Sequence, residues 1–121
     1  MTVDRRTLGR LGEQLAVEHL LARGYDLVAR NWRAGRLGEV DVIARDHDCL
    51  VFVEVRTRQS ARYGSAEESV TPAKQARLAA LAAAYCAAVD WQGPVRVDVL
   101  AITPTPDGGW QIQHIIDAVS E

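Results

Sequence analysis

The chain has 121 residues, of which 48% are hydrophobic and 25% are charged, and its formal net charge is −2. These values are ordinary for a globular domain with a sizeable core, and they argue against a disordered, fibrous or membrane-spanning protein. The slight negative charge also argues against a uniformly basic nucleic-acid-binding protein. A local basic surface stays open, because residues 1–62 carry 11 basic and 9 acidic side chains whereas residues 63–121 carry 3 and 7.

The start of the chain and its cysteines predict a cytoplasmic protein. Met1 is followed by Thr-Val-Asp-Arg-Arg rather than by an apolar stretch, so we expect no secretory signal. No apolar run is long enough to cross a membrane. Cys49 and Cys86 lack metal-ligand spacing, and we expect them to be reduced packing residues.

The first predicted element is a helix over residues 5–23, which Gly24 ends. An apolar stripe at three- and four-residue steps marks its buried side, and the histidine in this stripe is interpreted as a packing residue. The stripe consists of Leu8, Leu11, Leu15 and His19.

Three strands are predicted next. Residues 25–32 alternate weakly between polar and apolar side chains, and a hairpin turn at residues 34–36 leads to a second strand over residues 38–45. A short turn at residues 46–48 leads to a third strand over residues 49–57.

A loop at residues 58–66 precedes the second predicted helix, which Thr71 caps and Pro72 opens. Residues 94–103 are predicted to form a fourth strand, and residues 110–116 a fifth at an edge of the sheet. The order αβββαββ predicts an α/β fold in which a mixed sheet is flanked by helices.

The second and third strands carry acids in otherwise apolar segments. Residues two apart in a strand share a face, so Glu54 and Arg56 follow Phe52 on one face of the third strand. If the two strands pair through their short turn, Asp41 and Glu54 converge near one end of the sheet. Adjacent carboxylates repel unless one is protonated or a cation lies between them. Such oxygens suit Mg²⁺ or Mn²⁺, with the Val55 carbonyl and waters completing an octahedron.

A structural interpretation of the same acids stays open. An aspartate near the start of one strand and a glutamate near the end of the next could form salt bridges with neighbouring arginines at the rim of the sheet. Spacing alone does not decide between a cation site and such salt bridges.

Motifs along the whole chain resemble one protein family. They are LGRLGEQLAVEHLLARGY, RNWR, GEVDVIARD, LVFVEVRTR, VTPAKQARL, VRVDVLAI and IQHIIDAV. These segments resemble the YraN family of small bacterial proteins of unknown function, for which the block GE-x-D-x-IA…FVEV-x-TR is specific. That family in turn resembles restriction-endonuclease-like folds and archaeal Holliday-junction resolvases, which share a D…E-x-K active site on a mixed sheet.

The resemblance implies a single nuclease-like domain over residues 1–121 with a restriction-endonuclease-like fold. It implies an endonuclease that hydrolyses DNA, branched or recombining DNA included, with Mg²⁺ or Mn²⁺ as cofactor. Asp41 and Glu54 match the two metal ligands, and Glu13 matches the additional acid of the resolvases. By the same analogy the expected partners are DNA and a second copy of the chain. No membrane partner is expected.

Arg56 departs from the family pattern, which has lysine at this position. Arginine keeps the positive charge, but its pKa above ~12 rules it out as a general base. Either the site is weakened and the protein only binds nucleic acid, or another lysine acts instead. Lys74, at the start of the second predicted helix, is the only lysine in the chain. The catalytic candidates are therefore Glu54, Arg56 and Lys74.

Two arginine-rich stretches are candidates for gripping nucleic-acid phosphates, because arginine beside an aromatic ring suits backbone contacts and base stacking. Alternatively, they are a hairpin tip and a solvated loop whose aromatic rings pack onto the core. The candidate residues are Arg30, Trp32, Arg33 and Arg36 in RNWRAGR, and Arg58, Arg62 and Tyr63 in RTRQSARYG.

Asp98 lies between valines in a predicted interior strand. It is interpreted as a structural partner of Arg96 or another arginine, although it could also complete the acidic cluster. His114, near the end of the chain, receives no chemical role. Three functions stay open: a nuclease, a non-catalytic nucleic-acid-binding module on a degenerate nuclease fold, and a scaffold whose acids are structural only.

Overall fold

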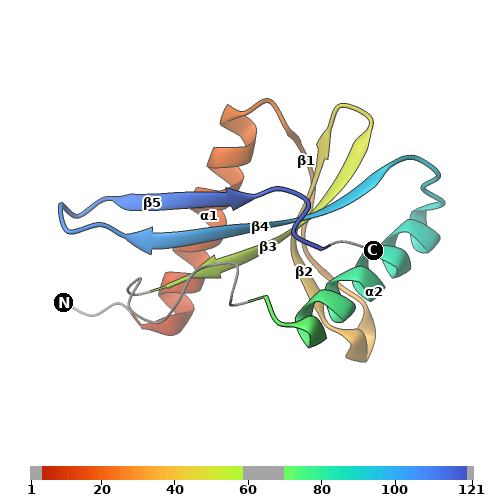
Figure 1. Ribbon diagram of the computed structural model, residues 1–121, viewed down its shortest axis with the longest axis horizontal. Helices are drawn as coiled ribbons and strands as arrows, with labels where there is room; N and C mark the ends of the chain where they lie inside the picture. Colours follow the sequence, from red (N-terminus) through yellow and green to blue (C-terminus); the bar gives the residue numbers. More distant parts are fainter. Residues whose placement is uncertain (1–3, 59–69, 120–121) are drawn as a thin grey trace.

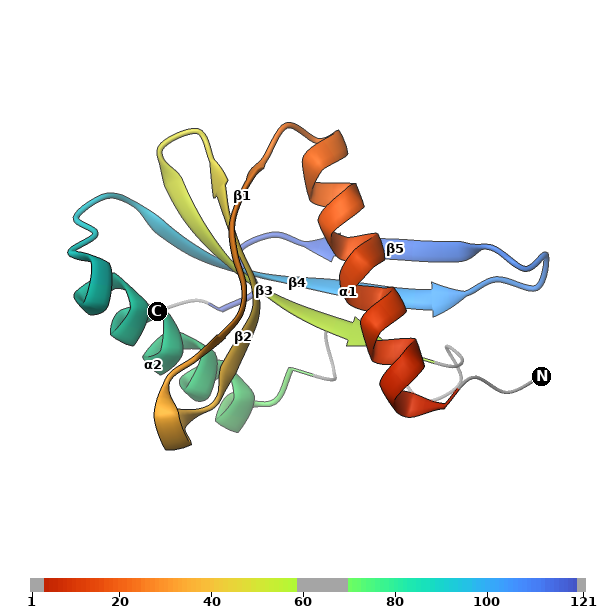
Figure 2. The same cartoon turned by 180° about the vertical axis from the view of Figure 1, so that it is seen from behind.

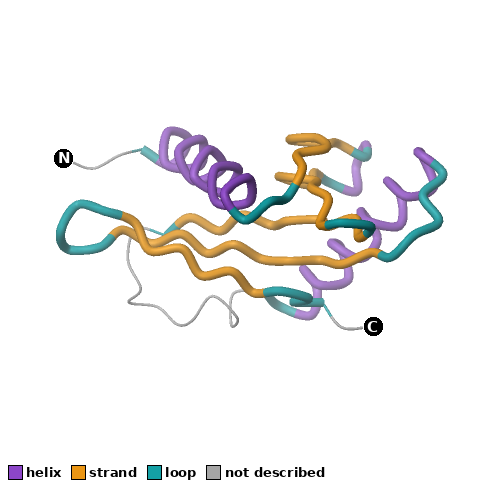
Figure 3. The backbone as a smooth tube through the Cα atoms, turned by 90° about the horizontal axis from the view of Figure 1, so that it is seen from above, coloured by secondary structure: helices purple, strands orange, loops and turns teal. Residues whose placement is uncertain are grey.

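A five-stranded sheet with one helix on each face makes up the described part of the chain (Figures 1 and 3). The computed structural model describes residues 4–58 and 70–119. The predicted order αβββαββ is confirmed, and so is the mixed sheet flanked by helices, which is the architecture of a restriction-endonuclease-like fold. In chain order the elements are α1 (Arg5–Ala22), β1 (Asp26–Arg33), a 3-10 turn η1 (Gly35–Leu37), β2 (Glu39–Asp46), β3 (Cys49–Thr57), α2 (Pro72–Val89), β4 (Val95–Pro104) and β5 (Trp110–Ile115).

Local sequence signals set the helix starts. Asp4 caps α1, because its Oδ1 accepts a hydrogen bond from the Thr7 amide at 2.8 Å. Thr71 caps α2 in the same way through the Lys74 amide at 3.3 Å, and Pro72 follows at the start of the helix. Over the residues that the structure describes, neither helix has the length and apolar character needed to cross a membrane.

The strand order is β1-β2-β3-β4-β5, and all neighbours are antiparallel except β3 and β4. A parallel pair needs a crossover connection, and α2 lies within the crossover from β3 to β4. These two strands are central and largely buried on both faces, which explains their long apolar runs. The prediction that the fifth strand lies at an edge is confirmed.

Each face of the sheet has its own apolar core, one beneath α1 and one beneath α2 (Figure 3). Cys49 packs against the first core and Cys86 against the second, and both are free thiols, as predicted. The α1 core consists of Ala16, Val17, Leu20, Tyr25, Val42, Ala44, Val51, Val53, Leu100 and Ile102, and the α2 core of Val40, Ile43, Leu50, Phe52, Leu78, Leu81, Ala82, Tyr85 and Val97.

Asp98 is fully buried in the face covered by α1, and its role is structural. Arg96 donates to it through Nε at 2.9 Å and Nη2 at 3.1 Å, and the Asp117 amide donates at 2.9 Å. His114 Nε2 lies 2.7 Å from its Oδ2. Burial by itself would raise the pKa of Asp98, but the hydrogen bonds from His114 and Arg96 hold it below the ordinary value. The predicted pairing with Arg96 is therefore confirmed.

Candidate functional site

The acids of the two middle strands meet where those strands separate. Strands β2 and β3 pair from the turn onward, and Val42 with Val53 is the last pair. Beyond this point the strands diverge, and we call the region the fork (Figures 1 and 2). Asp41 and Glu54 are the next residues on either side. Asp41 Oδ2 accepts a hydrogen bond from the Val55 amide at 2.8 Å. Just beyond the last β2–β3 pair, a side-chain carboxylate is thus the hydrogen-bond acceptor for an amide of β3.

Asp41 and Glu54, which we call the acid pair, interact directly. Burial first, and then the hydrogen bond with Glu54 and its negative charge, raise the pKa of Asp41 to about 8. The Val55 amide opposes this rise, and the charge of Glu13 adds to it. At neutral pH the pair therefore holds a proton. The convergence predicted from strand alternation is present in the structure.

Glycine brings the third acid, Glu13, close to the fork. A Cβ atom on Gly12 would lie only 2.0 Å from Thr57 Oγ1, so α1 approaches the end of β3 more closely than any other residue would allow. The next residue is Glu13, and its charge acts on Asp41. Its Oε1 is buried and has no hydrogen-bond partner among the described residues. A buried oxygen without a partner is costly, and a positively charged ligand would satisfy it.

The acids at the fork have the donor chemistry of a hard-cation site. Mg²⁺ and Mn²⁺ take oxygen ligands, and two strands and a helix supply carboxylates here. Within the described parts of the chain, no three His, Cys, Asp or Glu side chains are arranged to hold a metal ion. The fit to a divalent cation thus rests on the chemistry of the donors, namely the acid pair and the unpartnered oxygen of Glu13, and not on a preformed ligand geometry.

The salt-bridge interpretation of the acid pair finds no support in the same region. Among residues 4–58 and 70–119, neither Asp41 nor Glu54 forms an ion pair with an arginine. The arginines that do pair with acids lie elsewhere: Arg33 pairs with Glu39 at the hairpin, and Arg96 pairs with Asp46 and Asp98.

Lys74 lies within electrostatic reach of Arg56 and of Glu54. Lys74 is half-buried in the first turn of α2, and Figures 1 and 2 both show this end of α2 below the fork. Burial and the charge of Arg56 lower the pKa of Lys74, while the charge of Glu54 opposes the shift. Arg77 also lowers it. The structure thus brings Lys74 and Arg56 to one neighbourhood, although 17 residues separate them.

The arginines around the first hairpin do not gather on one surface. Arg30 reaches Gln14 of α1 at 3.5 Å, whereas Trp32 packs edge-on against Tyr85 of α2 with ring centroids 5.2 Å apart. Residues two apart in a strand ordinarily share a face, but Asn31 between them has a positive φ of 53°, which interrupts the alternation of β1. The two candidates therefore reach opposite faces of the sheet. Trp32 acts as a packing residue here, and nucleic-acid contact by this stretch stays a prediction.

The other candidates of these two stretches lie at chain turns. Arg36 is exposed in η1, and Arg33 is exposed while pairing with Glu39 at 3.1 Å. Arg58 is half-buried just beyond β3, where its amide donates to the Ile102 carbonyl at 2.9 Å. Arg62 and Tyr63 lie outside the described residues.

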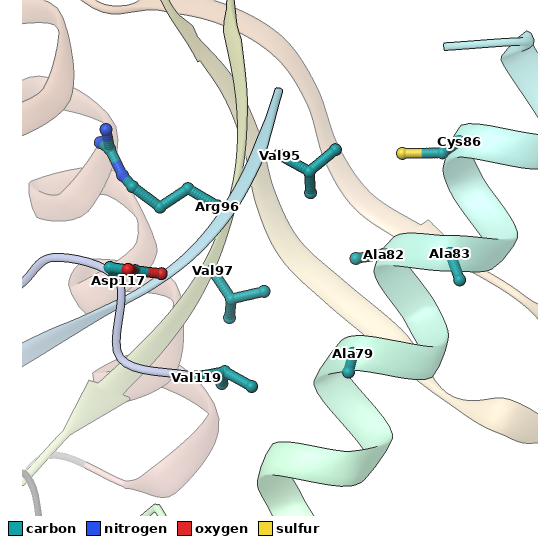
Figure 4. Close-up of a pocket in the computed structure, with 9 residues that line it drawn as sticks. All are labelled: Ala79, Ala82, Ala83, Cys86, Val95, Arg96, Val97, Asp117 and Val119. Atoms are coloured by element: carbon teal, nitrogen blue, oxygen red, sulfur yellow. The ribbon is translucent and has the colours of Figure 1, made fainter. Parts of the chain in front are cut away.

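An apolar pocket between α2 and the start of β4 is separate from the acids at the fork. Its volume is about 550 Å³, and none of the predicted site residues line it. Small side chains of α2, among them Ala79 and Ala82, face Val97 across it, and the thiol of Cys86 points inward (Figure 4). The pocket therefore belongs to the α2 core and not to the acidic site.

The contact between Gly12 and Thr57 is the part of the site that the sequence analysis missed. A glycine within a helix costs about 1 kcal/mol relative to alanine, so its presence in α1 indicates a close approach. The signal was ambiguous, because Gly9 lies in the same helix and a Cβ atom added there would meet no atom within 4 Å.

Replacing Gly12 with alanine should therefore separate α1 from β3. We expect Gly12→Ala to lower the free energy of unfolding by about 1–3 kcal/mol, because the added methyl group collides with Thr57. Gly9→Ala is the matched control, and its open position should make it stabilising by about 0.5–1 kcal/mol. Urea denaturation measures both. Equal effects of the two substitutions would contradict the close contact.

The raised pKa of Asp41 should make the free energy of unfolding decrease as the pH rises. Its pKa is about 8 in the folded protein and 3.8 ordinarily, so between these values the folded state holds a proton that the unfolded state releases. In metal-free buffer, Asp41→Asn should raise the free energy of unfolding at pH 7.5 by about 1–3 kcal/mol and flatten its pH dependence. Denaturation between pH 5 and 9 measures this, with exposed Asp48→Asn as control. A destabilised Asp41→Asn with an unchanged pH dependence would contradict the assignment.

Comparison with known proteins identifies the family. The family model described as uncharacterised protein family UPF0102 matches residues 12–102. A UPF0102 protein of Symbiobacterium thermophilum is 52% identical over 114 residues, covering 93% of this chain and 96% of that protein. One of Herpetosiphon aurantiacus is 47% identical over 119 residues, covering 94% of each chain. The chain therefore belongs to uncharacterised protein family UPF0102, the YraN family that its motifs resemble.

Proposed function

We propose that the protein is a metal-dependent nuclease that hydrolyses phosphodiester bonds in DNA at the fork. The observation that carries the proposal is the acid pair beside the unpartnered oxygen of Glu13. Two interacting, half-buried carboxylates disfavour the folded state, and the buried oxygen of a third acid increases the cost. Titratable groups perturbed in this way are typical of functional sites.

The three acids are the proposed ligands of Mg²⁺ or Mn²⁺. When bound, the cation supplies an activated water and neutralises charge that develops on the phosphate. Asp41 and Glu54 would hold it from the two strands, and Glu13 from α1. The hydrogen bond from the Val55 amide keeps the Asp41 carboxylate oriented toward the fork, which pre-organises the site.

The two cationic side chains, Arg56 and Lys74, have different roles in this proposal. Arg56 remains charged at all relevant pH values, so it can stabilise negative charge on a phosphate but cannot accept a proton. Lys74 has a lowered pKa and lies within reach of the charge of Glu54, so it is the better candidate for orienting the attacking water. Lys74 thereby takes the role that the resemblance assigns to a lysine at position 56.

Arg56 also favours a second candidate function. If Lys74 does not compensate for the missing lysine, the fork would bind a cation and nucleic acid without cleaving it. The protein would then be a nucleic-acid-binding module on a degenerate nuclease fold.

A cleavage assay separates these functions. Wild type, Glu54→Gln, Arg56→Lys and Lys74→Gln are compared on single-stranded, duplex and four-way-junction DNA with Mn²⁺. We expect cleavage by the wild type, a loss of about 100-fold or more in Glu54→Gln, and a loss of at least about 10-fold in Lys74→Gln. Glu18→Gln, an exposed position on α1, is the control and should cleave like the wild type.

Two outcomes would contradict the nuclease. Cleavage that persists undiminished in Glu54→Gln would show that the fork is not the reaction centre. Cleavage by Arg56→Lys alone would show that one residue disables the site, and would favour the binding module.

A further inference from the structure

A pair of histidines lies on the α1 face of the sheet, away from the proposed ligands. His19 is six residues beyond Glu13 in α1, which is about 9 Å further along the helix axis. His114 lies in β5, and its ring packs against the ring of His19 with centroids 5.4 Å apart. His19 Nε2 is 3.4 Å from His114 Nδ1. Neither histidine has a role in the proposed nuclease.

The separation of the two nitrogens suits a shared metal ion. Zn²⁺ binds histidine nitrogens at about 2.0–2.1 Å, and two such bonds at a tetrahedral angle place the nitrogens about 3.3 Å apart. The 3.4 Å between His19 Nε2 and His114 Nδ1 is therefore close to the span that a tetrahedral ion requires.

A buried carboxylate fixes which nitrogen of His114 carries the proton. His114 Nε2 lies 2.7 Å from Asp98 Oδ2, and Asp98 already accepts hydrogen bonds from Arg96 and from the Asp117 amide. Nε2 must therefore be the donor, and in the neutral ring this places the lone pair on Nδ1. A carboxylate that holds the far nitrogen of a histidine is the usual second partner of a metal-binding imidazole.

The facing nitrogen of His19 also carries a lone pair, which accepts a hydrogen bond from Arg23. Arg23 Nε donates to His19 Nε2 at 2.9 Å, so that nitrogen carries no proton. With His114 in this neutral tautomer, the 3.4 Å contact between the two histidines has an acceptor nitrogen on each side. A bound cation would satisfy both nitrogens at once. Arg23 is exposed, so its side chain can move into solvent when a cation arrives.

We propose that His19 and His114 bind one divalent cation of the Zn²⁺ class, with water in the remaining positions. In the described residues no third His, Cys, Asp or Glu completes a set of protein ligands, so the affinity is expected to be moderate. The site goes beyond the proposed nuclease function and prefers softer ions, because its ligands are imidazoles and not carboxylates. Binding would fasten the C-terminal half of α1 to the edge strand β5.

Thermal unfolding of metal-free protein with and without ZnCl₂ tests the proposal. A ligand that binds only the folded state raises the melting temperature, and we expect a rise of at least about 3 °C in wild type at saturating Zn²⁺. His19→Gln in a Glu54→Gln background, which lacks one of the proposed ligands at the fork, should remove the rise. His47→Gln is the matched control, because His47 is exposed in the β2–β3 turn and should keep it. Glu54→Gln should also keep the rise, which separates this site from the fork.

Isothermal titration of the same proteins gives the affinities. His19→Gln should weaken Zn²⁺ binding by at least about 10-fold, the effect expected when one of two imidazole ligands is lost. Arg23→Gln should strengthen it, since a competing donor and a nearby positive charge are removed. Absence of a thermal shift in the wild type, or a shift that is the same in Glu54→Gln with and without His19→Gln, would overturn the proposal. Weaker binding by Arg23→Gln would overturn it as well.

Discussion

The hydrogen bond from the Val55 amide to Asp41 is the interaction on which the proposed site depends. It joins Asp41, one residue beyond the last pair of β2 and β3, to Val55, two residues beyond that pair, so the two strands part without leaving this amide unpaired. The opening leaves room for acids from both strands. Helix α1 reaches the opening because Gly12 allows contact with Thr57, and the start of α2 reaches it because α2 lies in the crossover out of β3.

Asp98, which is fully buried, and Asp41, which is half-buried, differ in how their charges are compensated. Asp98 is surrounded by donors from Arg96, His114 and a backbone amide, so its charge is compensated. Asp41 has one backbone donor and faces the carboxylate of Glu54, which raises its pKa. Donors compensate the negative charge of Asp98, whereas the acid pair at the fork lacks comparable donors. The fork is therefore the better candidate for binding a cation.

Period-two alternation and one short turn were enough to predict much of the fold from the sequence. They predicted the strands and the meeting of Asp41 with Glu54, because a tight turn fixes the register of its two strands. Contacts between distant elements could not be derived in this way. The approach of Lys74 to Arg56 depends on how α2 returns across the sheet, and the pairing of His19 with His114 joins residues 95 positions apart. Alternation would place Arg30 and Trp32 on one face of β1, but the positive φ of Asn31 interrupts it and the two side chains reach opposite faces. The pattern RNWRAGR does not reveal this interruption.

The central claim is that the acids at the fork bind a divalent cation, and a crystal structure of the protein grown with Mn²⁺ tests it most directly. Anomalous diffraction locates manganese independently of any assumption about the ligands. The account predicts one strong peak between Asp41 and Glu54, with Oε1 of Glu13 turned toward it and the proton of the acid pair displaced. Crystals at saturating Mn²⁺ that show no peak at the fork, with Asp41 still hydrogen-bonded to Glu54, would contradict it.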